Sequence, residues 1–205
     1  MEAGDETAGM AGEVTGRGTV HDAGVEAIGL VEFNSIAFGI QAADEMVKIA
    51  PVELVIAMTI CPGKYLSLVV GDVSSVDSSV RRGVAVGADT VVDSLFIPNV
   101  HPMIFPAMMG TAAPGGIASV GVIETFSVAS AIIAGDGAAK AAEVRLIDLR
   151  VAQGLAGKSY VTMTGDVSDV TAGVRAGVDL IKESGMLVKS VVIPSPHDDL
   201  KGKLV

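Results

Sequence analysis

The feature that most constrains this chain of 205 residues is an internal repeat, because sequence segments of its first half recur in its second half. Residues 28–32 (Ile-Gly-Leu-Val-Glu) return as residues 120–124 (Val-Gly-Val-Ile-Glu), and Gly-Asp-Val-Ser occurs at both 71–74 and 165–168. The offset between matching segments grows slowly along the chain, which places the insertions in turns. A repeat of this kind indicates two copies of one structural unit.

Hydrophobic periodicity predicts the order β-α-β-β-α-β, followed by a short helix, in each copy. In the first copy, Ser35 and Asp72 precede the two helical patterns and are suited to cap them. The expected strands lie at residues 27–33, 52–60, 65–70 and 90–97, and the short helix at 101–109. Apolar residues spaced three or four apart are expected to form the buried stripe of each helix. In the first copy the stripe of the first helix is Ile36, Ile40, Ala43, Val47 and Ala50, and that of the second helix is Val73, Val76, Val80 and Val84. In the second copy the stripe of the second helix is Val167, Val170, Val174 and Val178. The predicted fold is of the α/β (α+β, ferredoxin-like split) class, in two tandem domains.

The chain divides into four parts. Residues 1–26 are rich in Gly, Glu and Thr, lack a hydrophobic period, and are expected to form a disordered acidic tail. The first domain is expected over residues 27–110 and the second over residues 118–205. Residues 111–117 are rich in Pro and Gly and are predicted to form the linker between the two domains.

Composition excludes several function classes. A net charge of -10 disfavours nucleic-acid binding, which needs clustered Lys and Arg. The sequence has no apolar run of about 18 residues, so no transmembrane helix is expected, and residues 1–26 lack the pattern of a signal peptide. A single cysteine rules out an internal disulfide framework and fits a reducing cytosol. An aromatic content of 3% makes a deep apolar ligand cavity unexpected.

A tandem repeat also favours a pseudosymmetric assembly. If a single copy closed as a six-fold ring, three tandem chains would close the same ring, so we hypothesise a homotrimer. Cys61 is the only cysteine and lies in the turn between the second and third expected strands. On a three-fold axis this one thiol would become three, which is enough to hold a metal cluster.

The symmetry of a [4Fe–4S] cube suits such a site, since three thiolates can ligate three irons while the fourth lies on the axis. Such clusters normally take four thiolates, so the fourth iron would need water or an outside donor. Pro62 and Gly63 suit a tight turn whose N–H groups could approach the cluster. Lys64 would either offset its negative charge or be a solvated turn residue. The competing interpretation is that Cys61 is a small buried hydrophobe.

The repeated motifs resemble the bacterial microcompartment shell domain. The resemblance rests on the start at residues 27–32, the Ala-Asp-x-Met-Val-Lys-x-Ala run at 43–50, Gly-Asp-Val-Ser at 71–74, and the Ile-Pro ending with His101. It implies a flat pseudohexameric trimer, not an enzyme, that tiles a microcompartment shell in the cytoplasm beside other shell proteins. It also implies tile-edge contacts by Lys48, Lys140, His101 and His197. Asn99 and Ser195 stand where single-copy family members carry Arg, so altered edge contacts are expected.

The turn at residues 59–64 (Thr-Ile-Cys-Pro-Gly-Lys) resembles that of iron–sulfur-binding trimeric shell proteins of propanediol-utilisation compartments. This resemblance implies one [4Fe–4S] cluster per trimer in place of an open central pore, with Cys61 as the metal ligand and Pro62 and Gly63 beside it. Electron transfer across the shell, with a lumenal or cytosolic redox partner, would follow.

Other functions stay open or are disfavoured by the sequence. The main alternative is a redox-inert tile whose central pore, lined by Cys61, passes small metabolites. An effector-binding regulatory trimer would need a nucleotide cleft between subunits. Residues 152–159 match a relaxed P-loop, but a β-rich run follows them where a helix is required. Glu32 and Glu124 recur at matching positions and are expected to be structural carboxylates in preference to a catalytic pair.

Overall fold

The computed structural model describes residues 25–204. The predicted acidic tail at residues 1–26 therefore lies outside the described residues, apart from its last two. No helix in the described part of the chain is long and apolar enough to cross a membrane.

The first domain has the predicted element order, with one added 3-10 turn. Its elements are β1 (Ala27–Phe33), α1 (Ile36–Ile49), β2 (Glu53–Ile60), β3 (Lys64–Gly71), α2 (Val73–Gly87), η1 (Ala88–Thr90), β4 (Val91–Pro98) and α3 (Ile104–Met108). The second domain repeats this order. Its elements are β5 (Ser119–Thr125), α4 (Val128–Ala141), β6 (Arg145–Arg150), β7 (Ser159–Gly165), α5 (Val167–Ile181), η2 (Lys182–Ser184), β8 (Leu187–Ile193) and α6 (Asp198–Leu204).

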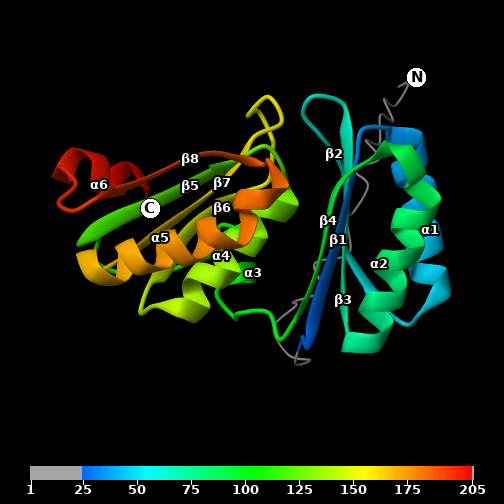
Figure 1. The fold of residues 1–205 in the computed structure, drawn as a ribbon, viewed down its shortest axis with the longest axis horizontal. Coiled ribbons are helices and arrows are strands. Elements are labelled where there is room, and N and C mark those ends of the chain that lie inside the picture. The colour runs from blue at the N-terminus through cyan, green and yellow to red at the C-terminus, as the bar shows by residue number, and fades with distance from the viewer. Residues whose placement is uncertain (1–24, 205) are drawn as a thin grey trace, which may run out of the picture.

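Each domain forms one antiparallel four-stranded sheet, and the strand order is the same in both. The order is β2-β3-β1-β4 in the first sheet and β6-β7-β5-β8 in the second. Matching residues also keep the same register, since Ile28 pairs with Val70 and Val120 pairs with Thr164. The predicted fold class, two α+β domains of one kind, is confirmed (Figure 1).

Helix starts follow the predicted caps. The Ser35 hydroxyl accepts a hydrogen bond from Phe38 N, and the Ser127 hydroxyl accepts one from Ser130 N. Asp72 caps α2 more strongly, since its Oδ1 accepts from Ser74 N at 3.0 Å and from Ser75 N at 2.9 Å. These hydrogen bonds, those to Ser75 first, lower the pKa of Asp72 well below its ordinary value of 3.8.

Small residues let the helices approach the sheets closely. A Cβ added to Gly29 would lie 2.4 Å from Val80 Cγ2, and one added to Gly121 would lie 2.6 Å from Val174 Cγ2. Both distances are far below a van der Waals contact. Glycine at the centre of the first strand of each domain is therefore a packing requirement.

The first sheet is covered on both faces (Figure 1). One face packs on α1 and α2 through a cluster that includes Val31, Phe33 and Met46. The opposite face, with Leu30 and Leu68, belongs to the cluster that contains the core of the second domain. Because β1 alternates between these two clusters, its residues form the continuous apolar run seen in the sequence.

The predicted buried stripe of α1 is mostly wrong for a single chain, since of its five positions only Ala43 is buried. Ile36 is 40% exposed and Ile40 is 54% exposed, and Val47 is also exposed. The helix instead buries its small residues and one methionine, namely Gly39, Ala42, Ala43 and Met46. The physical reason is the close approach of the helix, since a Cβ on Gly39 would lie 2.5 Å from Tyr65 Cβ.

The stripes predicted for the second helix of each copy are correct in their middle, but three of their four end positions are exposed. In α2, Val76 and Val80 are buried while Val73 and Val84 are exposed. In α5, Val170 is buried and Val167 is exposed. Val178, at the other end of the α5 stripe, is partly buried against the core.

The two Asp caps provide a matched test of helix capping. We expect Asp72→Ala to lower the urea midpoint at pH 7 more than Asp166→Ala, because Asp166 caps α5 without any side-chain hydrogen bond. The folded-state pKa of Asp72 is depressed, so its contribution is present above its ordinary pKa and is lost as pH falls towards the folded value. The difference between the variants should therefore shrink below about pH 4. Equal midpoints at pH 7 would contradict the capping role.

Candidate functional site

The turn that holds Cys61 projects from the end of the β2–β3 hairpin. Gly63 N donates to Ile60 O at 3.1 Å, which closes the turn. Gly63 has a φ of 90°, in the left-handed region that favours glycine. The peptide bond between Cys61 and Pro62 is cis. The Cys61 thiol is free and partly exposed, so it is available to a ligand at the tip of the first domain.

The matching loop of the second domain, residues 151–158, lies against this turn. Cys61 N donates to Ala152 O at 3.1 Å. A Cβ added to Gly157 would lie 2.9 Å from Pro62 Cδ and 3.4 Å from Cys61 O. The two equivalent loops of the repeat are therefore in direct contact, which the sequence did not indicate.

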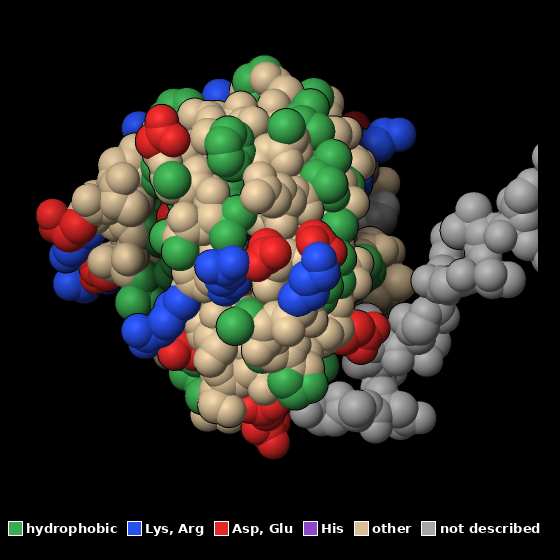
Figure 2. Space-filling model, turned by 90° about the vertical axis from the view of Figure 1, so that its right-hand side faces the viewer, with side chains coloured by type: hydrophobic (Ala, Val, Ile, Leu, Met, Phe, Trp, Pro, Cys, Tyr) green, Lys and Arg blue, Asp and Glu red, His purple; other side chains and the backbone are tan. Residues whose placement is uncertain are grey.

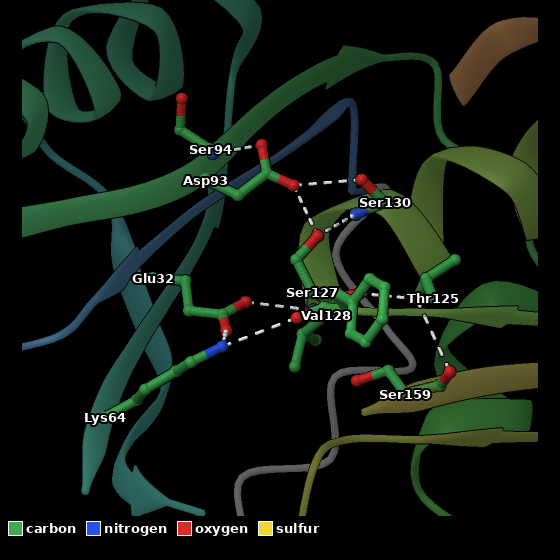
Figure 3. A network of polar contacts seen from close by, with 10 residues as sticks. Glu32, Lys64, Asp93, Ser94, Thr125, Ser127, Val128, Ser130 and Ser159 are labelled. Carbon is green, nitrogen blue, oxygen red and sulfur yellow. Dashed lines mark hydrogen bonds and ion pairs between the residues drawn. The ribbon is translucent and has the colours of Figure 1, made fainter. Parts of the chain in front are cut away.

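Lys64 ties the cysteine turn to the second domain through a buried carboxylate (Figure 3). Its Nζ lies 2.7 Å from Glu32 Oε1, and the other carboxylate oxygen of Glu32 accepts from Val128 N at 2.9 Å. The Glu32 side chain is fully buried and that of Lys64 is 15% exposed. Glu32 thus bridges the cysteine turn to the first turn of α4, where a negative charge also meets the positive end of the helix dipole.

This arrangement corrects the predictions made for Lys64. The residue is not a solvated turn residue, because its ammonium group lies in a largely buried ion pair. Its charge is compensated by Glu32. An effect of Lys64 on the charge of a cluster stays a prediction. Glu32 and Glu124 are structural carboxylates, as predicted, since Glu124 Oε1 pairs with Lys158 Nζ at 2.9 Å.

Asp93 on β4 makes a second polar link between the domains (Figure 3). Its Oδ2 accepts hydrogen bonds from the hydroxyl groups of Ser127 and Ser130, the latter at 2.9 Å. The Ser127 hydroxyl in turn accepts from Ser130 N at 3.1 Å. The first domain therefore holds the N-cap of α4 from two strands. Lys189 occupies the matching position in the second copy, so the repeat itself offered no signal for Asp93.

Two of the predicted tile-edge residues meet at one carboxylate. Asp136 on α4 accepts from His101 N at 2.7 Å through Oδ1 and pairs with Lys140 Nζ at 2.6 Å through Oδ2. Their counterparts are not brought together in one chain, since Lys48 pairs with Asp44 and the His197 imidazole is exposed. The tile-edge role of these four residues stays a prediction.

Within residues 25–204, no group of three or more His, Cys, Asp or Glu side chains could hold a metal ion. A single chain thus offers one thiol, and a metal centre at Cys61 is incomplete without further copies. The segment at residues 152–159 leads into strand β7 and not into a helix, so the rejection of a P-loop is confirmed.

The buried ion pair should be worth far more than an exposed one. We expect Glu32→Gln to cost about 3–5 kcal/mol of unfolding free energy, because it leaves Lys64 with an unpaired charge in a largely buried position. The control Asp77→Asn breaks an exposed pair with Arg81 within α2 and should cost about 0.3–0.5 kcal/mol. Urea unfolding measures both. Similar costs for the two variants would show that the bridge does not join the turn to α4.

Comparison with known proteins assigns the chain to a family. The BMC domain family matches residues 27–100 and 119–196. The bacterial microcompartment shell protein PduT of Citrobacter freundii is 42% identical over 180 residues, which is 88% of this chain and 98% of that protein. The carboxysome assembly protein CcmO of Synechococcus elongatus is 26% identical over 190 residues, 87% of this chain and 68% of CcmO.

Solved structures agree. A microcompartment protein from Desulfitobacterium hafniense DCB is 52% identical and covers 87% of this chain and 99% of its own, with a TM-score of 0.77. The fused permuted hexameric shell protein MSM0275, at 19% identity and a TM-score of 0.57, shares the fold over 76% of this chain and 81% of its own. The chain therefore belongs to the BMC-domain family of bacterial microcompartment shell proteins and carries two such domains in tandem.

Proposed function

We propose that three copies of this chain close into a pseudohexameric shell tile. The three Cys61 thiols face the tile axis and hold one [4Fe–4S] cluster, which passes electrons across the shell to a lumenal or cytosolic redox partner. The observation that carries the proposal is the contact between Cys61 and Ala152. It brings the two equivalent loops of the repeat together, as a ring of six alternating loops around one axis requires.

The interface inside the chain serves as a template for the interface between chains. On α4, Val128 and Ile132 are fully buried at the junction with the first domain. Their counterparts on α1 are Ile36 and Ile40, which are exposed together with Phe38. Figure 2 shows the face that carries α1 and α2, with apolar side chains in green beside paired charges. A second copy of the chain, presenting its second domain, would cover the α1 residues as the first domain covers α4.

The edge strands also differ in burial, since a residue that is buried in the second domain has an exposed counterpart in the first. On β6, Leu146 is 2% exposed, and α3 of the first domain packs along this strand. On β2, the counterpart Leu54 is 36% exposed. The α6 helix of a neighbouring chain would cover Leu54 if the interface were repeated.

Glu124 is the counterpart of Glu32 and could make the same contact at the interface between chains. Glu32 uses one carboxylate oxygen for Lys64 and the other for Val128 N. Glu124 uses one oxygen for Lys158, and its carboxylate is still partly exposed. In a repeated interface, the second oxygen of Glu124 would accept from the backbone N–H of Ile36 in the next chain. Three tandem chains joined in this way close a ring with no unmatched face.

The donor set fits a cluster only in the trimer. One thiol per chain gives three per ring, one fewer than the four thiolates that [4Fe–4S] clusters usually take, so one iron would carry water or another outside donor. When bound, the cluster would supply one-electron transfer. The chain's own part is to hold Cys61 at the end of a rigid hairpin, fixed by the Lys64–Glu32 pair and by the hydrogen bond to Ala152. The tile itself would turn over no substrate.

The trimer can be tested at α1. We expect the wild-type protein to be trimeric by light scattering coupled to size exclusion, and Phe38→Lys to shift it towards the monomer, because the charge would be buried against the next chain. The control Val84→Lys changes an exposed valine on α2, whose counterpart α5 packs on its own domain, and should stay trimeric. A monomeric wild-type protein, or a trimer unaffected by Phe38→Lys, would contradict this interface.

The cluster can be tested separately. Protein purified without oxygen should be brown, contain about four irons and four sulfides per trimer, and bleach on reduction. Cys61→Ser should remove the colour and the iron but leave the trimer intact. A colourless, iron-free wild-type trimer would overturn the cluster while keeping the tile. It would favour a redox-inert tile whose central pore, lined by Cys61, passes small metabolites.

A further inference from the structure

The two repeats differ most on one face of their sheets. In the first domain, the paired residues of β2 and β3 on this face are apolar: Ile56 pairs with Leu68, and Met58 pairs with Leu66. At the matching positions of the second domain, Asp148 pairs with Thr162, and Arg150 pairs with Tyr160. One copy thus has an apolar patch where the other has two charged and two hydroxyl side chains.

The short helix after each domain differs in the same way. In the first copy, α3 buries Ile104, Ala107 and Met108. In the second copy, α6 has no buried residue and carries Lys203 at the position of Ala107. In Figure 1, α6 lies on the side of the second sheet opposite to α5. A helix that is buried within the chain in one copy is matched in the other by a charged helix that is exposed in a single chain.

A hollow of about 240 Å³ lies between α6, the linker and this polar face. Its polar lining comes from Asp148, Arg150, Tyr160, Thr162 and Lys203. A second hollow of about 200 Å³ shares Gly110, Asp148 and Arg150 with the first and reaches Gln153 in the loop beside Cys61. Each hollow is smaller than a typical drug-sized pocket of roughly 300–1,000 Å³, so the space suits a small metabolite.

The charges in the hollow leave a cationic group free. Arg150 donates through Nε to Asp148 Oδ2 at 2.6 Å, and Tyr160 Oη lies 3.4 Å from the same oxygen. The hydrogen bond to Asp148 raises the pKa of Arg150, so the guanidinium stays charged. The Asp148 contact uses only Nε of Arg150, and the Tyr160 hydroxyl also interacts with the guanidinium. Asp148 is thus already compensated, while the Arg150 side chain is still 64% exposed and presents the terminal side of its guanidinium, and Lys203 is a second cation in the lining.

We propose that this hollow binds a small organic anion through a carboxylate or phosphate group. The two terminal nitrogens of Arg150 match the paired oxygens of such groups, and Lys203 adds a second positive charge. Among the described residues that line the hollow, two cations stand beside one carboxylate, in a chain whose net charge is -10. The site is independent of Cys61 and of the cluster.

Ligand-observed saturation-transfer NMR on the full-length protein tests the site. The probes are lactate as the carboxylate and glycerol 3-phosphate as the phosphate, with lactamide and glycerol as their neutral counterparts. We expect saturation transfer to at least one anion, with a dissociation constant in the millimolar range, and none to the neutral compounds. The anion that binds more tightly identifies the headgroup.

Variants locate the binding. Arg150→Gln should weaken the anion about tenfold or more, and Lys203→Gln should weaken it less, because a flexible single cation contributes less than a paired donor. The control Arg175→Gln removes an exposed arginine of α5 outside the hollow and should leave binding unchanged. Arg150→Lys keeps the charge but loses the paired geometry, so it should fall between the wild type and Arg150→Gln. The proposal fails if neither anion binds, if the neutral compounds bind equally, or if Arg150→Gln binds as the wild type does.

Discussion

The buried carboxylate of Glu32 is the interaction on which the relation between the two domains depends. A buried charge is tolerated only when it is compensated, and here the compensation comes from two sides. Lys64 belongs to the cysteine turn of the first domain, and Val128 N belongs to the first turn of a helix in the second. Because both contact one carboxylate, Glu32 joins the cysteine turn, the first strand and α4. The hydrogen bond from Cys61 N to Ala152 O adds a second contact between the turn and the second domain.

Tandem repetition means that each chain satisfies this arrangement once and leaves its counterpart open. Val128 and Ile132 are buried inside the chain while Ile36 and Ile40 remain exposed, although all four occupy matching helix positions. An apolar helix face of this kind is costly in water, and in the proposed trimer a second copy of the same chain would cover it. In that trimer, the exposed stripe of one chain and the partly open Glu124 of the next would belong to one interface.

The two copies agree where the fold is built and differ where a ligand can be held. Gly29 and Gly121 meet the same packing demand, and Ser35 and Ser127 cap the same helix start. By contrast, the thiol of Cys61 is absent from the second loop, and the polar pair of Asp148 and Arg150 is absent from the first sheet. Both proposed binding sites lie at positions where the two copies differ.

The sequence by itself determined the repeat, the strands, the helix caps and the turn at Cys61, because each depends on the spacing of neighbouring residues. It did not determine which face of α1 is buried, since apolar spacing is the same whether a helix faces its own sheet or another chain. Nor could it show that Lys64 reaches Glu32 or that Asp93 holds the N-cap of α4. These contacts join residues far apart in the chain, so only the packing of one domain on the other decided them.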